Sequence, residues 1–166
     1  MRYGNFSVSL SVFIRRVIAN SVFAMIEFQT YDVEMPALDF ALLREWIERV
    51  CQAHDRLPGS LVYQFCSDEH ILDVNRRFLG HDYFTDIITF PYSEGQRVSG
   101  DILISLDTVR TNAEGVGESY MRELHRVIIH GVLHLCGIDD KGPGEREMMQ
   151  AHEDEALSLL DSLETD

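Results

Sequence analysis

Short apolar segments recur along the chain, each rich in β-branched and aromatic residues and flanked by turn-forming residues, which is typical of β-strands. Four strands are predicted in this way, at residues 26–30, 61–66, 85–90 and 102–105. Pro58 and Gly59 have the character of a turn before the second strand, and Pro91 is expected to end the third.

Longer segments place apolar residues every three or four positions, which predicts amphipathic helices. The expected helices span residues 38–52, 68–78, 106–113 and 119–136, and a last acidic helix follows Gly142-Pro143-Gly144 and ends near residue 160. Ser67, Ser105 and Ser119 stand where N-cap residues are favoured, whereas Gly115 and Gly117 are expected to break the helix before them.

Strand-like and helical segments alternate, which favours a mixed α and β architecture over an all-helical bundle or a β-sandwich. A chain of 166 residues with 45% hydrophobic composition can bury one sizeable core and is short for two domains. Between the α/β and α+β classes we predict α+β: a single domain with a small mixed β-sheet of about four strands packed with about five helices.

Composition changes at Met25. Residues 1–24 contain arginines and no acid, while the remainder is strongly acidic. We interpret residues 1–24 as an N-terminal extension, either a non-native start or disordered, and residues 25–166 as the functional domain. A signal peptide is the alternative, but the apolar stretch of residues 6–14 is short, is followed at once by two arginines, and cannot span a membrane.

The formal charge of -14 disfavours broad electrostatic binding to DNA or to anionic membranes, so neither is expected as a partner. Lys141 is the only lysine, and arginine, the better bidentate phosphate ligand, supplies the other cations. An RNA substrate is compatible with this composition if its contacts are local.

The cysteines are three in number, widely spaced and outside any Cys-x-x-Cys pair, which argues against disulfides and cysteine-rich zinc sites. Cys51, Cys66 and Cys136 each lie in an apolar segment, so we expect them to be buried in a protein of the reducing cytoplasm.

The segment from His130 to Asp140 carries the strongest chemical signal. Two histidines four residues apart on a helix project from one face, so both imidazoles can bind one ion. Gly137 can end the helix in a left-handed conformation and return Asp140 toward the same ion, with Asp139 as the alternative third ligand. Three protein ligands leave a fourth position for water, as in a metal-dependent hydrolase.

The alternative is a pair of structural histidines that form hydrogen bonds within the core. Residues 127–136 are otherwise almost wholly apolar, so two unpaired imidazoles would be costly to bury there. We therefore favour a single divalent metal, zinc first, held by His130, His134 and Asp140.

The spacing also matches the metzincin protease pattern His-Glu-x-x-His-x-x-Gly-x-x-His. Gly131 occupies the position of the general-base glutamate, and glycine cannot accept a proton. A metalloprotease remains the second hypothesis, and a non-catalytic ribosome-associated module with a structural zinc is the third.

Residues 130–140 resemble the signature of the YbeY-type bacterial endoribonucleases, His-Gly-x-Leu-His-Leu-x-Gly-Tyr-Asp-His. This chain has Ile138 in place of the tyrosine and Asp140 in place of the last histidine. Upstream, residues 75–78 followed by 85–91, and then residues 100–105, resemble two further blocks of the family in the right order. The resemblance covers roughly residues 60–160.

The resemblance implies a zinc-dependent, single-strand-specific endoribonuclease of the cytoplasm that acts in ribosomal RNA maturation, at the 16S 3′ end, and in ribosome quality control. RNA and the ribosome or ribosomal proteins would be its partners, and the metal helix would be zincin-like. Aspartate in place of the third histidine lowers the charge of the site by one unit, which should raise the pKa of bound water and admit other divalent metals.

An arginine that is often important in this family would fall at Leu79, so another cation must replace it. Arg76, Arg77 and Arg97 are candidates for steadying charge on a phosphoryl group, and of these we select Arg77; each also fits a solvated surface cation.

Asp86 and Asp101, at strand starts, are candidates for orienting a histidine or a water, and each also fits an ordinary turn residue. His81, His125 and His152 are weaker candidates, and packing is the expected role of His152.

Overall fold

The computed structural model describes residues 24–165, so the interpretation of residues 1–24 lies, except for Ala24, outside the described residues. Within these residues four strands form one sheet in the order β1-β2-β4-β3. The strands are β1 (Met25–Thr30), β2 (Leu57–Cys66), β3 (Ile87–Pro91) and β4 (Arg97–Ser105). β2 pairs in parallel with both β1 and β4, while β3 is antiparallel to β4. The mixed sheet predicted from the sequence is confirmed.

Five α-helices and one π-helical turn complete the described part of the chain. They are α2 (Phe40–Ala53), α3 (Asp68–Val74), the π-helical turn η1 (Asn75–Leu79), α4 (Leu106–Val116), α5 (Tyr120–Leu135) and α6 (Glu145–Glu164). The hydroxyls of Ser67, Ser105 and Ser119 accept hydrogen bonds from backbone N–H groups of the helices that follow them, which confirms the predicted N-caps. No described helix has the length and apolarity needed to cross a bilayer.

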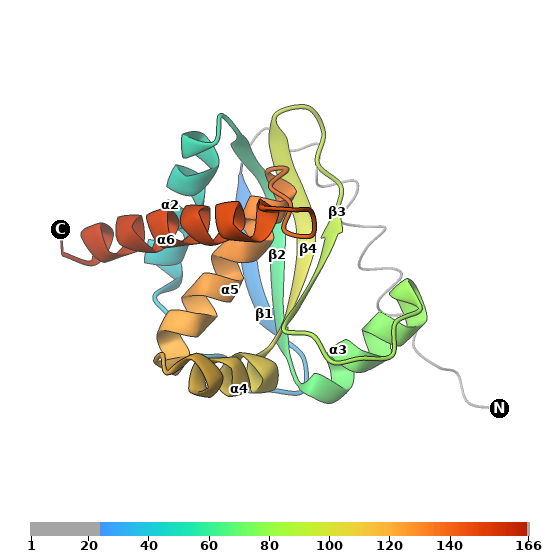
Figure 1. Ribbon diagram of the computed structural model, residues 1–166. Helices are drawn as coiled ribbons and strands as arrows, with labels where there is room; N and C mark the ends of the chain where they lie inside the picture. Colours follow the sequence, from blue (N-terminus) through green and yellow to red (C-terminus); the bar gives the residue numbers. More distant parts are fainter. Residues whose placement is uncertain (1–23, 166) are drawn as a thin grey trace.

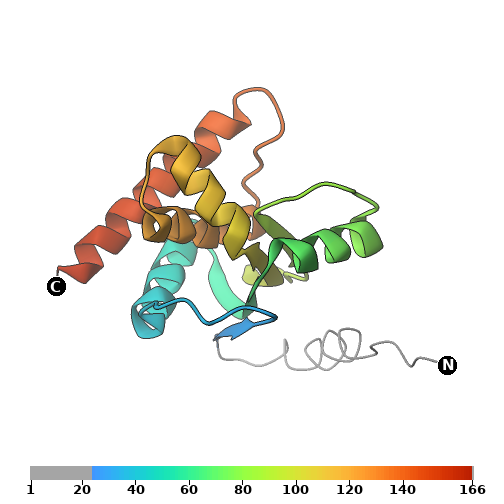
Figure 2. The ribbon, with the colours of Figure 1, turned by 90° about the horizontal axis from the view of Figure 1, so that it is seen from below.

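The helices α2 and α5 pack on one face of the sheet, and α6 lies across both of them as an outer layer (Figure 1). The view from below shows α4 and α6 on the same side of the strands (Figure 2). Side chains alternate along β4, so Ile102 and Ile104 join the main core under α5, whereas Leu103 joins a smaller core with α3 on the opposite face. The sheet is therefore a platform that positions α5.

The predicted turn at Pro58 and Gly59 is wrong, because both residues lie inside β2. The pairing of β2 with β4 shifts register between Pro58 and Leu61, which accommodates proline in the strand. Gly59 permits the close approach of β4, since a Cβ atom there would lie 2.2 Å from Oγ of Ser99.

β3 ends at Pro91, as the sequence predicts, and Pro91 itself is paired opposite Gly100, as an edge strand allows. Gly115 lies within the last turn of α4, which ends at the left-handed Gly117 instead. The three cysteines are free thiols; two are buried as expected, and Cys136 is partly exposed.

Candidate metal centre

The helix α5 presents His130 and His134 on one face, one turn apart, with ring centroids separated by 4.5 Å. The Nε2 atom of each imidazole lies 3.6 Å from Oδ2 of Asp140. One ligand atom from each of the three residues lies within 4.8 Å of the others, an arrangement that could hold a metal ion. The convergence expected from the sequence is therefore present, and we call these three residues the metal cluster.

Asp140 reaches the helix face because the chain reverses sharply after α5. Gly137 has a φ of 97°, in the left-handed region that favours glycine, and its N–H donates to the carbonyl of His134 at 2.9 Å. The guanidinium of Arg56 donates to the carbonyl of Cys136 at 3.2 Å, which ties the turn to the residue that directly precedes β2. Asp140 is thus held by a turn that is itself anchored to the sheet.

The donor set fits zinc. Ligands at about 2.0–2.2 Å in a tetrahedron are separated from one another by about 3.3–3.6 Å, a range that includes the 3.6 Å between each imidazole nitrogen and the carboxylate of Asp140. A separation of 3.6 Å is too long for a hydrogen bond, so neither imidazole is hydrogen-bonded to Asp140. Asp139 is exposed and lies outside the cluster, which favours Asp140 as the third ligand.

A buried carboxylate from α6 supports the cluster. Oε1 of Glu153 lies 2.6 Å from Nδ1 of His130, and its other oxygen accepts a hydrogen bond of 3.0 Å from Arg126. The guanidinium of Arg126 also contacts Asp154 at 2.9 Å. The contact between Glu153 and His130 fixes the orientation of the His130 ring and places Nε2 toward Asp140.

Glu153 has no role among the predictions from the sequence, although the sequence carries a signal for one. Glu153 falls on the apolar stripe of α6, four residues after Met149 and three before Ala156, and is only 7% exposed. A carboxylate at such a position requires a polar partner. Only the packing of α6 on α5 reveals that this partner is His130.

The two histidines titrate differently. Burial tends to lower the pKa of His130, but the hydrogen bond and charge of Glu153, with Asp86 and Asp140, raise it above its ordinary value. The pKa of His134 is lowered by burial and by His130. His134 is therefore neutral at pH 7, with a lone pair available for a cation.

Gly131 lies where α5 touches the sheet. A Cβ atom there would lie 2.9 Å from Cδ1 of Ile87 and 3.2 Å from Cγ2 of Ile102. The position that carries a general base in metzincin proteases therefore faces the hydrophobic core instead of the metal cluster.

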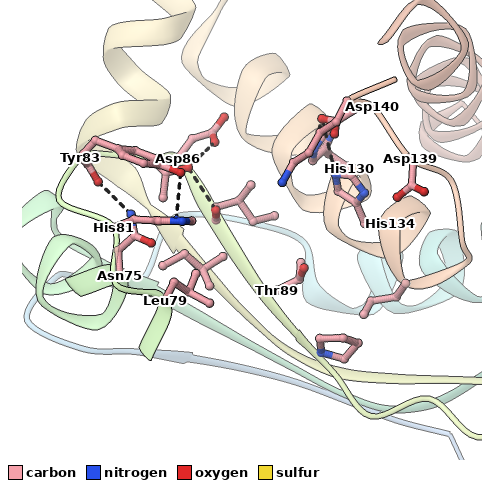
Figure 3. Close-up of a pocket in the computed structure, with 16 residues that line it drawn as sticks. Asn75, Leu79, His81, Tyr83, Asp86, Thr89, His130, His134, Asp139 and Asp140 are labelled. Atoms are coloured by element: carbon pink, nitrogen blue, oxygen red, sulfur yellow. Dashed lines mark hydrogen bonds and ion pairs between the residues drawn. The ribbon is translucent and has the colours of Figure 1, made fainter. Parts of the chain in front are cut away.

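The cluster opens into a pocket of about 520 Å³ between α5 and the segment that joins η1 to β3 (Figure 3). Residues from both walls line it, including His81, Tyr83, Asp86, His134 and Lys141. Burial raises the pKa of Asp86, against the opposing effect of His130, and its carboxylate accepts a hydrogen bond of 3.3 Å from Asn112. Lys141 is the one lysine or arginine among the described residues that line the pocket.

The structure does not bring the other predicted catalytic residues into this pocket. Arg77 is exposed and pairs with Asp73 at 2.9 Å. Asp101 accepts a hydrogen bond of 2.8 Å from Tyr92. Strand alternation places the side chain of Asp101 on the face of the sheet opposite α5.

The alternative arginines also lie outside the pocket lining. Arg76 pairs with Asp82, and Arg97 donates to the carbonyl of Pro58 at 3.4 Å. Leu79, at the position of the family arginine, does line the pocket.

Of the three weaker histidine candidates, only His81 lines the pocket. The ring of His125 packs edge-on against Trp46, and His152 packs in the same manner against His54.

Comparison with known proteins agrees with this geometry. Residues 26–161 match the family model described as Endoribonuclease YbeY. The chain is 58% identical over 136 residues to "Endoribonuclease YbeY" of Phocaeicola vulgatus, covering 82% of this chain and 99% of that protein. It is 57% identical over 134 residues to the protein of the same name from Bacteroides thetaiotaomicron, covering 81% and 98%.

A solved structure has the same fold. The solution structure of TM1509 from Thermotoga maritima superposes with a TM-score of 0.54 at 27% identity, covering 83% of this chain and 93% of that one. The family model, matched over residues 26–161, extends over the sheet, α5 and the metal cluster alike. This chain belongs to the YbeY endoribonuclease family.

Proposed function

We propose that this protein is a zinc-dependent endoribonuclease that cuts single-stranded RNA in the cytoplasm, acting in the maturation of ribosomal RNA at the 16S 3′ end and in ribosome quality control. The observation that carries the proposal is the cluster of His130, His134 and Asp140 at the wall of an open pocket. Relatives that this chain matches over nearly their whole length are named endoribonucleases. The free cysteines are those of a reducing compartment.

His130, His134 and Asp140 are the proposed ligands of one zinc ion. When bound, zinc would supply a Lewis acid for a phosphoryl oxygen or for the attacking water. Glu153 holds the His130 ring in the orientation that binding requires, and the turn at Gly137 does the same for Asp140.

Asp86 and Lys141 are the further groups that we place in the reaction. Burial raises the pKa of Asp86, which favours a carboxyl group able to exchange a proton with water or substrate. Lys141 is suited to bind a phosphate oxygen beside the cluster, the role predicted for an arginine. The roles predicted for Arg77 and Asp101 have no support from the pocket geometry and remain sequence-based predictions.

RNA recognition must be local on a chain with a net charge of -14. The same charge is complementary to basic proteins, which supports the proposed association with ribosomal proteins. Protease activity has less support, because Gly131 packs on the sheet and offers no general base.

The test is cleavage by the purified full-length protein of single-stranded RNA, duplex RNA and casein, each with and without a metal chelator. We expect cleavage of single-stranded RNA alone, lost with chelator and restored by added zinc. Cleavage of casein would support the protease, and folded, zinc-containing protein that cuts none of the three would support a structural zinc module.

A matched pair of variants assigns any activity to this site. His134→Ala should abolish RNA cleavage, while His70→Ala, which removes a histidine of α3 that does not line the pocket, should leave it intact. A contaminating nuclease would be unaffected by the substitution, so loss of cleavage in His134→Ala alone excludes one. Equal RNA cleavage by His134→Ala and the unmodified protein would contradict the proposal.

A further inference from the structure

Four of the nine exposed large hydrophobic residues in the part of the chain that the structure describes lie in one short segment beside the metal pocket. Phe78, Leu79, Tyr83 and Phe84 are 58%, 44%, 57% and 59% exposed. We call these four residues the aromatic strip. Exposed apolar side chains that are gathered together, in contrast to isolated ones, mark interaction surfaces.

The aromatic strip is continuous with the candidate metal centre. Leu79 and Tyr83 line the same pocket as His130 and Asp140. Figure 3 shows Tyr83 and His81 together on the wall across from the metal cluster, with β3 running between that wall and the cluster. A molecule that fills the pocket from the cluster to the opposite wall would therefore contact Tyr83.

The Tyr83 ring is held in place before any ligand arrives. It stacks on the His81 ring with centroids 5.2 Å apart and an interplanar angle of 20°, and its hydroxyl is hydrogen-bonded to Nδ1 of His81 at 3.0 Å. The buried Asn75 in η1 donates to the carbonyl of Tyr83 at 3.0 Å and accepts from the N–H of His81 at 3.3 Å. A ring fixed in this way loses little conformational entropy on binding.

We propose that Tyr83, supported by His81, is a stacking platform for one unpaired nucleobase of the RNA whose phosphodiester lies at the metal cluster. The inference rests on the proposed function and adds a substrate-binding subsite to it. Aromatic rings bind single strands by stacking on bases, without the positive charge that this acidic chain lacks. Lys141, also in the pocket lining, would contact the adjacent phosphate.

The platform also gives a physical reason for single-strand specificity. Bases in a duplex are already paired and stacked on their neighbours, so none is free to lie on Tyr83. The cost of extracting a base from a duplex would oppose binding at this subsite.

The first test is steady-state cleavage of a short single-stranded RNA by the zinc-loaded full-length protein. Tyr83→Leu keeps an apolar side chain but removes the ring, and should raise KM about tenfold with little change in kcat. Tyr83→Trp should retain a KM close to that of the unmodified protein. Circular dichroism establishes that each variant is folded.

A second histidine-stacked tyrosine provides the control. Tyr31 is 46% exposed and stacks on His70 with ring centroids 3.9 Å apart, but neither residue lines the pocket. Tyr31→Leu should therefore leave KM unchanged. An equal rise in KM for Tyr31→Leu and Tyr83→Leu would overturn the proposal, since it would reflect a general loss of surface apolarity.

The second test moves an abasic nucleotide along the RNA. An abasic nucleotide at one particular position should raise KM about tenfold for the unmodified protein. It should have no further effect on Tyr83→Leu, because the contact between base and ring is already absent in that variant. The stacking proposal fails if the unmodified protein cleaves RNA while Tyr83→Leu has the same KM and the same dependence on the abasic position. In that case the proposed function would stand without a stacking subsite at Tyr83. Absence of any RNA cleavage by unmodified protein would instead contradict the proposed function itself.

Discussion

Nδ1 of His130 lies 2.6 Å from Oε1 of Glu153, which joins the metal-site helix α5 to the outermost helix α6. The contact is enclosed, because Glu153 is almost fully buried and Arg126 binds its second oxygen. An imidazole that donates from Nδ1 to a carboxylate presents the lone pair of Nε2 to a metal. The outer layer of the fold thus takes part in shaping the site.

Glu153→Gln should weaken zinc binding by about 10- to 100-fold, because the amide is a poorer acceptor for the His130 N–H and no longer increases the basicity of the ring. Competition between metal-free protein and a fluorescent chelator measures the affinity. Asp154→Asn is the matched control, since Asp154 also pairs with Arg126 but has no contact with His130. Equal loss of affinity in both variants would show that the effect is merely one of surface charge.

Removing the third ligand should distinguish the two adjacent aspartates. Asp140→Ala should lose most of its bound metal, because its oxygen lies 3.6 Å from the Nε2 atoms of both histidines, whereas Asp139→Ala should retain it. Elemental analysis of freshly purified proteins gives the result directly. Retention of a full equivalent by Asp140→Ala would exclude this residue as a ligand.

Gly131→Ala should reduce the free energy of unfolding by about 1–3 kcal/mol, because the added methyl group overpacks the contact of α5 with Ile87 and Ile102. Urea denaturation of the metal-free protein separates this effect from loss of zinc. Gly115→Ala is the control: it lies in α4 with no atom near the added methyl group, and should raise stability by up to about 1 kcal/mol. If both variants were stabilised, the tight contact at Gly131 would be refuted.

Stability should decline as the pH falls below about 6.5, in part through His125. Burial lowers the pKa of His125 from its ordinary value of 6.5, Arg122 adds to that effect, and Glu164 and Asp161 oppose it. The unfolded chain therefore binds a proton at a pH where the folded chain does not. The contribution of His125 to stability is fully present above the pKa of this histidine in the unfolded chain. It is lost as the pH falls toward the lower pKa of the folded chain.

Urea denaturation of the metal-free protein across this pH range provides the measurement. His125→Gln should have a shallower decline than the unmodified protein, while part of the slope remains because burial also lowers the pKa of His54 and His70. An unchanged slope in His125→Gln would rule out this histidine as a contributor.

Local patterns were sufficient to predict the four strands, the α-helices and the N-caps. The spacing of apolar residues marked the strands and helices, and serines marked the N-caps. Local signals were misleading where pairing between strands decides the outcome. Pro58 and Gly59 have the composition of a turn, yet the register of β2 against β4 keeps them in a strand. The turn preference of Pro-Gly was outweighed by pairing with a segment 39 residues away.

The residues of the candidate site likewise divide into those that a local pattern predicts and those whose position depends on tertiary packing. His130, His134 and Asp140 fall within eleven consecutive residues, so the helical repeat and the turn at Gly137 were enough to predict their convergence. Arg77 and Asp101 were plausible by residue type, but Arg77 pairs with Asp73 on the surface, and Asp101 lies on the face of the sheet opposite α5.

The sequence by itself determined the family, the elements and a group of three candidate metal ligands, since all of these are expressed in short-range patterns. Only the tertiary structure decided that Glu153 supports His130, that Gly131 faces the sheet and that Tyr83 stands opposite the metal cluster. The physical reason is that these relationships join residues on separate elements. Their distances are set by how the helices pack on the sheet, which no local pattern specifies.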